Sequence, residues 1–332
     1  MAESTVAAGI SARTSPLPWL GYVLALVTIY VLYWLFPGNL LILTKIATLA
    51  ILVMSLDLVT GYAGLPTLGH AAMFGVGAYG AGLWAKYVAS EPLSGLVVAS
   101  GSGALLALLA GLFLVRYQGL AFLMLTIAVS LIMQNLASKM QGVTGGDDGL
   151  SGFQIDPLLG YFQFDMFGVT GYWYSVLALL FSYAVLKRIM NSPFGLCCEG
   201  IRENRDRMAA NGTRVYPHLV RLYVIAGAFA GLAGGLTAQV NQIVGLDTLG
   251  FELSAEALVM LVLGGLGHLW GGLVGTTVFT LIHHHAATSN PFHWLFFIGG
   301  LLMLVVFLPK GFARRYLQQM GCRIRGMFRG RA

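Results

Sequence analysis

The sequence predicts an all-α membrane protein, a polytopic bundle of about ten transmembrane helices with broken or re-entrant glycine-rich segments. Three observations support this prediction. Of the 332 residues, 57% are hydrophobic and only 10% are charged, whereas soluble domains carry about 25% charged residues. Apolar runs of about 20 residues recur along the chain, which is typical of helices and not of barrel strands. The basic residues are confined to a few stretches, as expected of loops on one side of a membrane.

The distribution of charge predicts which segments face the cytoplasm. Seven of the 19 Lys and Arg residues lie in 187–221 and seven more lie in 310–331. Because basic loops stay on the inner side, we expect both stretches there, and we attribute the net charge of +6 to topology and not to nucleic-acid binding. Segment 138–172 has four aspartates and one lysine, so we expect it outside. The cysteines occur only in the two basic stretches, where reduced thiols are expected: Cys197, Cys198 and Cys322.

Sidedness constrains the number of crossings. We interpret 1–16 as a cytoplasmic N-terminal segment, 17–308 as the transmembrane domain, and 309–332 as a basic cytoplasmic tail. An odd number of crossings must precede the outer loop, and five segments are apolar enough: 17–36, 40–59, most of 61–88, 94–115 and 119–137. The first of them is interpreted as an uncleaved span and not as a signal peptide.

The second half of the chain must return to the cytoplasm and end there. Four segments are expected to do this: 173–190, 222–240, 254–285 and 292–308. The third of them must cross twice or re-enter, and we expect its break at Gly264-Gly265-Leu266-Gly267. Ser254 resembles a helix cap with Glu256 in the first turn. The residues of the tail fit either an amphipathic helix on the inner leaflet or a disordered basic tail.

The inner loop 187–221 has the pattern of a short helix with mixed charges. Ser192 suits the cap, Pro193 the first position and Gly212 the stop beyond the end. Glu203 and Arg207 have the favourable i, i+4 order. The mixture of signs argues against a lipid-binding loop. From the pattern alone, a docking surface for another protein and a solvated linker helix both remain open.

At this loop the sequence resembles a known family. Ser192-Pro193-Phe194-Gly195, Ile201-Arg202-Glu203-Asn204 and Ala209-Ala210-Asn211-Gly212 resemble the cytoplasmic loop of permease subunits of branched-chain amino-acid-type ABC importers. Further matching segments follow in the family's order: Gly61–Gly64, Leu68–Ala72, Gly77–Tyr79, Thr144–Leu150, Ala226–Leu236 and Met260–Gly275. The outer segment resembles that of the longer-looped permease type. Three positions depart from the family pattern: Thr67, His268 and Gly272.

The resemblance implies a type II importer-like fold and a coupling role for the inner loop, whose helix would dock on an ATP-binding subunit. The residues assigned to coupling are Pro193, Phe194, Gly195, Ile201, Arg202, Glu203, Asn204, Arg205 and Gly212. This chain has no phosphate loop of its own, because His70-Ala71 stand where a Lys and a Ser or Thr would be needed after Gly64–Gly69. It is therefore expected to be a transport subunit without a cofactor, and ATP and Mg would bind in partner subunits.

The resemblance also implies partners, location and cargo. The partners would be a second homologous permease, two ABC ATP-binding subunits, a periplasmic substrate-binding protein and the lipid bilayer. The chain would lie in the bacterial inner membrane with both termini cytoplasmic. Branched-chain amino acids are the default substrate, and urea, amides and aromatic acids are served by similar permeases.

The two glycine-rich segments point to a transport pathway, because broken helices in corresponding parts of two halves mark such sites. The predicted pathway residues are Thr67, Gly69, His70, Gly264, Gly265, Gly267 and His268. Close helix packing is the other interpretation of the glycines, since Gly227 and Gly231, and also Gly267, Gly271 and Gly275, recur at four-residue spacing.

Two other functional classes remain open. An ion-coupled secondary transporter would need no ATPase, but such carriers keep ionisable groups within their spans, and here Asp57 and Glu256 lie near predicted span ends. A membrane-embedded enzyme would need converging groups, for which His283-His284-His285 are the candidates. Adjacent helical residues point in different directions, so a membrane-edge segment explains these histidines better than a metal site.

Overall fold

The computed structural model describes residues 39–157, 168–289, 300 and 303. The chain divides into two compact units, residues 1–40 and 41–332, and all the described residues except 39 and 40 belong to the second. The N-terminal segment, the predicted span at 17–36, nearly all of the predicted span at 292–308 and the basic tail lie outside the described residues. The described part is helical, and its single β-bridge joins Leu150 to Val244.

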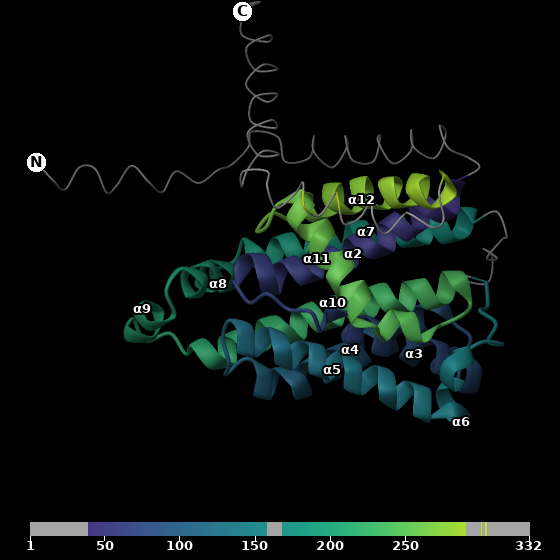
Figure 1. Cartoon of the computed structure of the whole chain (residues 1–332), viewed down its shortest axis with the longest axis horizontal. Coiled ribbons are helices and arrows are strands. Elements are labelled where there is room, and N and C mark those ends of the chain that lie inside the picture. Colours follow the sequence, from purple (N-terminus) through teal and green to yellow (C-terminus); the bar gives the residue numbers. More distant parts are fainter. Residues whose placement is uncertain (1–38, 158–167, 290–299, 301–302, 304–332) are drawn as a thin grey trace, which may run out of the picture. The chain divides into compact units, whose positions relative to one another are not determined.

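The long helices follow the predicted apolar segments (Figure 1). They are α2 (Leu40–Asp57), α3 (His70–Tyr87), α4 (Pro92–Leu114), α5 (Leu120–Lys139), α7 (Val169–Met190), α10 (Val215–Asn241), α11 (Phe251–Gly264) and α12 (Leu269–Ser289). The short elements are η3 (Leu58–Tyr62), α6 (Gln141–Thr144), η4 (Gly146–Asp148), α8 (Pro193–Glu203), α9 (Arg205–Ala210) and η5 (Leu246–Leu249).

Within the described residues, five helices are long and apolar enough to cross a membrane. They are α2 with η3, α4, α5, α7 and α10. The pair α11 and α12, bent by 113°, would count as a sixth if it forms one broken span. Helix α3 is not among them, so the predicted crossing over most of 61–88 stays a prediction. Helix α10 begins seven residues before the predicted span at 222, so the end of the inner loop is helical.

The core is built where α10 packs against α3 and α4. Glycines allow this close approach. A Cβ atom at Gly231 would lie 2.3 Å from the Ala99 carbonyl oxygen, and one at Gly77 would lie 2.4 Å from the Gly231 Cα. No side chain fits between these backbones, which confirms the close-packing interpretation of Gly231.

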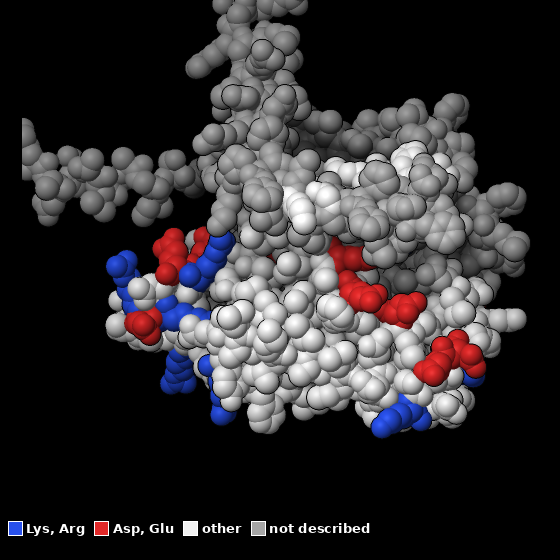
Figure 2. Space-filling view, in the orientation of Figure 1, with Lys and Arg blue, Asp and Glu red and all other residues white. Residues whose placement is uncertain are grey.

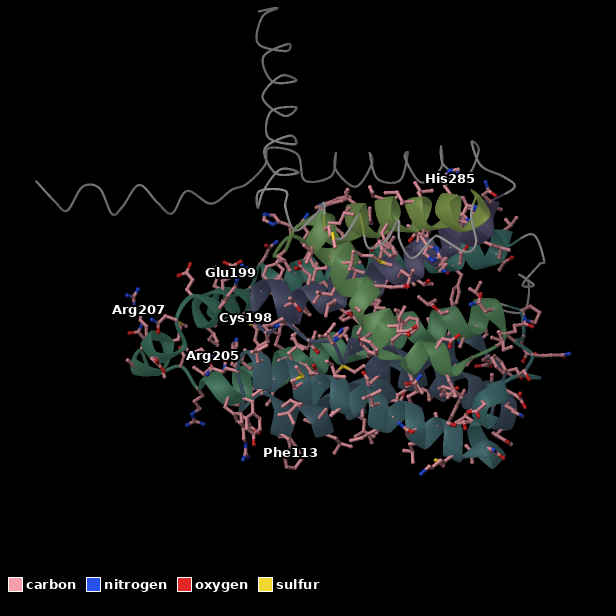
Figure 3. The ribbon with its side chains drawn as sticks, in the orientation of Figure 1. Phe113, Cys198, Glu199, Arg205, Arg207 and His285 are labelled. Atoms are coloured by element: carbon pink, nitrogen blue, oxygen red, sulfur yellow. The ribbon has the colours of Figure 1, made fainter. Side chains whose placement is uncertain are left out.

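The surface carries the charge pattern of a membrane protein. Figure 2 shows the Lys and Arg side chains gathered at the two ends of the helices, with a largely uncharged face between them. Helices α4 and α5 also expose large apolar side chains, among them Leu105, Leu109, Phe113, Leu120 and Met124. Figure 3 shows Phe113 extending away from the bundle. Such a face is suited to lipid or to another membrane chain.

Both glycine-rich segments are broken helices. After the π-helical turn η3, residues 63–69 are non-helical, and α3 then begins at His70. The second break separates α11 from α12 at Gly265–His268, which confirms the predicted position. The predicted cap at Ser254 is wrong. Helix α11 begins at Phe251, and the Ser254 hydroxyl instead accepts a 2.8 Å hydrogen bond from the Ala71 N–H in the first turn of α3.

Candidate functional site

The candidate site is the α8–α9 loop, which joins α7 to α10. Pro193 opens α8, as predicted. Ser192 occupies the cap position, as predicted, but its hydroxyl donates to the Ile189 carbonyl at 2.6 Å and makes no cap hydrogen bond to α8. Asn204 has an extended backbone, ends α8 and caps α9 by accepting from the Arg207 N–H at 2.9 Å. Glu203 and Arg207 therefore lie on separate helices and do not form the predicted i, i+4 pair.

One face of α8 is fixed to the bundle. Gly195, Cys198 and Ile201, spaced three residues apart, are buried. A Cβ atom at Gly195 would lie 2.0 Å from the Met190 carbonyl oxygen, so only glycine permits this approach to the end of α7. Phe194 stacks on His218 at 4.2 Å between ring centroids. The His218 Nε2–H also donates to the Phe194 carbonyl at 3.1 Å.

The opposite face of α8 is exposed. Leu196 is 66% exposed, and Glu199 and Glu203 are exposed on the same side. Figure 3 shows Glu199 and Arg207 pointing away from the bundle. We call Leu196, Glu199 and Glu203 the outward face of α8. Sequence reasoning did not select Leu196 and Glu199 as site residues. The spacing of three and four residues along Leu196, Glu199 and Glu203 places all three on one face of a helix, and this pattern could have identified them.

The predicted coupling residues therefore divide into two groups. Phe194, Gly195 and Ile201 hold α8 against the membrane helices, whereas Glu203 lies on its outward face. Gly212 has a positive φ of +83° beyond the end of α9, as a helix stop requires.

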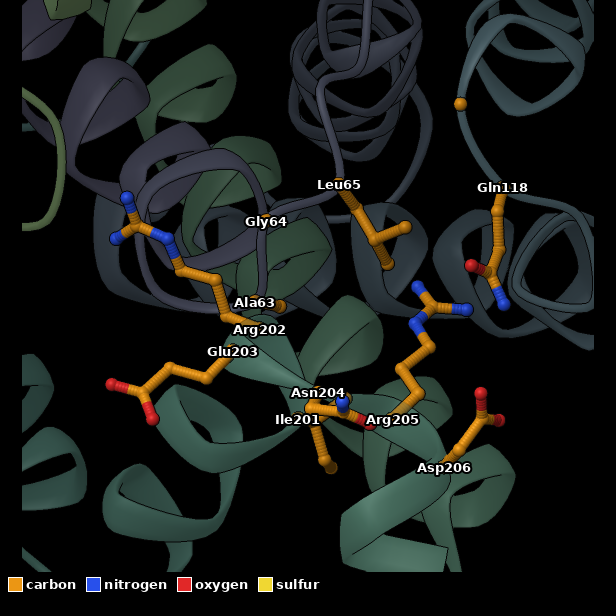
Figure 4. A pocket seen from close by; sticks show the side chains of 11 residues that line it. Ala63, Gly64, Leu65, Gln118, Ile201, Arg202, Glu203, Asn204, Arg205 and Asp206 are labelled. Atoms are coloured by element: carbon orange, nitrogen blue, oxygen red, sulfur yellow. The ribbon is translucent and has the colours of Figure 1, made fainter.

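A polar pocket of about 360 Å³ opens where this loop meets the membrane helices (Figure 4). Three segments line it: the first break, the turn between α4 and α5, and the α8–α9 junction. Figure 4 shows Arg205 and Gln118 extending toward one another, while Arg202 extends to the other side past Gly64. Burial lowers the pKa of the half-buried Arg205 guanidinium from its ordinary value.

The predicted pathway residues lie in different environments. Thr67 and His70 are fully buried. The Thr67 hydroxyl accepts from the Gly69 N–H at 3.2 Å, and His70 Nε2 lies 2.9 Å from the Ser55 hydroxyl. A Cβ atom at Gly69 would lie 2.5 Å from the Thr126 carbonyl oxygen. Neither Thr67 nor His70 lines the pocket described above.

The second break is partly exposed. His268 is exposed, with Nδ1 3.3 Å from the Leu266 carbonyl oxygen. Gly264 packs on the backbone of Gly271, whereas Gly265 and Gly267 have positive φ. The two breaks come close together, because Gly61, two residues before the first break, lies in contact with Gly267 in the second. The role of these residues in a pathway stays a prediction.

The histidine run lies at the end of α12 far from α8, where Figure 3 labels His285. The rings of His284 and His285 are tilted by 60° with centroids 6.1 Å apart. Among the described residues, no group of three His, Cys, Asp or Glu side chains is placed to hold a metal ion. His293 lies outside them.

Comparison with known proteins identifies the family. Residues 39–306 match the model of the permease component of branched-chain amino acid transport systems. The chain belongs to this family. It is therefore a multi-pass membrane protein and a transport subunit, and the family resemblance stated from the sequence is confirmed.

Three permease proteins named LivM are similar to this chain. The high-affinity branched-chain amino acid transport system permease protein LivM of Salmonella typhimurium is 26% identical over 307 residues, covering 82% of this chain and 69% of that protein. The Escherichia coli protein of that name is 25% identical, covering 79% and 66%. A probable LivM permease of Methanocaldococcus jannaschii is 24% identical, covering 77% and 87%. The chain spans about two thirds of the length of the two bacterial relatives. No solved structure matches it.

Proposed function

We propose that this permease is the inner-membrane subunit of an ATP-driven ABC importer and forms half of a pathway for branched-chain amino acids or related small polar solutes. The observation that carries the proposal is the two-sided helix α8. Its inner face is packed against the bundle, and its outward face presents an exposed leucine beside two acidic residues at a basic end of the molecule.

The proposed assembly has four further subunits. Two ATP-binding subunits dock beneath the permeases, one of them on the outward face of α8, and supply ATP and Mg. A second homologous permease completes the pathway, and a periplasmic protein delivers the substrate. The permease crosses the membrane about ten times with both termini cytoplasmic, so that basic loops remain inside.

In this mechanism the permease responds to its partners. Closure of the ATP-binding subunits moves α8 and α9, and the packed inner face of α8 transfers that movement to α7 and α10. The helices around the pathway then change between arrangements open to either side, as rigid packed elements do. Selection of the substrate rests mainly with the binding protein.

Copurification tests the docking surface. The chain is expressed with its candidate ATP-binding subunits, and the double variant Glu199→Lys/Glu203→Lys is compared with a control variant, Glu91→Lys. Glu91 is an exposed acidic residue at the start of α4. We expect the double variant to lose the ATP-binding subunits while its level in the membrane is unchanged, because reversed charges oppose docking. The control should keep the complex. An intact complex in the double variant would count against this docking surface.

Reconstitution tests the source of energy. Liposomes containing the assembled complex should take up substrate only with ATP and the binding protein. Substrate accumulation by this chain alone, driven by an ion gradient, would instead support a secondary transporter and contradict the proposal.

A further inference from the structure

Four groups from three separate parts of the chain meet beside α8. The first is Asp57, the last residue of α2, whose side chain is fully buried. Its Oδ1 accepts a 2.7 Å hydrogen bond from the Gly267 N–H in the second break, and its Oδ2 has no hydrogen-bond partner among the described residues. One carboxylate thus holds the backbone of the second break against the end of α2, more than 200 residues away in sequence.

Arg202 reaches the same point from α8. Its Nη1 donates to the Gly61 carbonyl, next to the first break. Its aliphatic stem lies over Gly64, where a Cβ atom would be 2.9 Å from the Arg202 Cγ. Nη1 also lies 3.3 Å from the place of a Gly267 Cβ. Arg202 is itself exposed, so a docked subunit can contact the residue that touches both breaks.

The packing at this point leaves no room for side chains. A Cβ atom at Gly61 would lie 1.9 Å from Asp57 Oδ1 and 2.5 Å from the Gly267 nitrogen. Gly267 has a φ of +79°, which favours glycine. Both glycines are therefore needed to bring the two breaks together beside the carboxylate.

The charges are also complementary. A buried carboxylate is costly unless a cation or hydrogen-bond donors compensate it. Arg202 supplies the nearby positive charge, and Gly267 supplies a donor. Broken helices have backbone groups outside the helical ladder, so a few residues there can absorb a change of conformation.

We propose that Arg202, Gly61, Asp57 and Gly267 form a latch that transmits movement of the α8–α9 loop directly to both glycine-rich breaks. Arg202 is the positioning residue of this latch. The inference rests on the proposed function, since it assigns the route by which a docked ATP-binding subunit acts on the membrane helices. The packed inner face of α8 holds the loop in place, and the latch couples it to the breaks.

The test uses the complete complex in proteoliposomes and measures uptake and ATP hydrolysis together. We expect Arg202→Gln to assemble normally and to keep ATP hydrolysis within about twofold, while uptake falls about tenfold, because the loss of a coupling contact separates the two activities. Arg202→Lys should recover part of the uptake, since it retains the charge and a donor. Arg116→Gln removes a charge from the exposed turn at the same end and should leave both activities unchanged.

A spin label at Leu266, which is 40% exposed in the second break, gives an independent measurement. Its spectrum should respond to ATP in the parent complex and not in Arg202→Gln. If Arg202→Gln fails to assemble, Asp57→Asn replaces it, because Asn keeps an acceptor for Gly267 but lacks the charge; the same loss of uptake is expected.

Unchanged uptake in these variants, or a parallel fall of uptake and hydrolysis with the spin-label response kept, would overturn the latch. Failure of the unmodified chain to assemble with ATP-binding subunits would refute the proposed function instead.

Discussion

At the scale of single residues, the absence of a side chain is as important as any contact. Gly231 lies where three helices cross, and the nearest atoms to a Cβ there belong to the backbone of α4. Backbone atoms cannot rotate away as a flexible side chain does. The same reasoning distinguishes Gly231 from Gly101, a glycine of α4 that has open space around its Cβ position.

We therefore predict that Gly231→Ala lowers stability and Gly101→Ala does not. Overpacking in a well-packed core costs about 1–3 kcal/mol, whereas alanine in place of an exposed helical glycine is neutral or favourable. The measurement is the thermal midpoint of the detergent-solubilised chain, which should fall for Gly231→Ala alone. Equal midpoints for the two variants would show that the helices can separate at this crossing without loss.

At the scale of elements, helix ends are completed by distant parts of the chain. The first turn of α3 has a free N–H at Ala71, and Ser254 from the interior of α11 accepts it. Nothing near Ala71 in sequence could reveal this partner, so local rules assigned Ser254 to the cap of its own helix. The break at Asn204 was missed for a similar reason, because the charges around it also fit one continuous helix.

Ser254→Ala should destabilise the chain, because it leaves a buried N–H without an acceptor, at a cost of about 1–3 kcal/mol. Ser130→Ala is the matched control: the Ser130 hydroxyl is buried without a partner among the described residues, so its removal should be neutral or stabilising. Thermal midpoints of both variants test the difference. A control as unstable as Ser254→Ala would show that the lost volume, and not the hydrogen bond, is responsible.

Sequence patterns were most informative where the physical cause is local. Apolar length predicted α2, α4, α5, α7 and α10, and glycine clustering placed the second break at Gly265–His268. Contacts such as Arg202 with Gly61 join segments about 140 residues apart, and they depend on how the helices pack. Hydrophobic periodicity within one segment does not reveal contacts with a distant segment, so the contact between the two breaks could not be predicted from the sequence.

At the scale of the molecule, helix α10 extends from the α8–α9 loop at one end of the bundle toward the acidic loop at the other end. It begins five residues after the last residue of α9, and soon after its end Val244 pairs with Leu150 of the acidic loop. Its 27 residues extend over roughly 40 Å, enough to cross a hydrocarbon core of roughly 30 Å. The α8–α9 loop and the acidic loop should therefore lie on opposite sides of the membrane.

Thiol labelling tests this sidedness. Burial raises the pKa of Cys198 to about 12, so its thiol stays protonated at neutral pH, and the thiolate is the reactive form. Cys197 is half-buried and can react. In a Cys198→Ala/Cys322→Ala background, a membrane-impermeant maleimide should label Cys197 in inside-out vesicles only.

A variant with Asp148→Cys as its single cysteine should be labelled in right-side-out vesicles only, because Asp148 belongs to the acidic loop. Labelling of Cys197 from outside would reverse the assigned topology, and docking of an ATP-binding subunit on α8 would then be impossible.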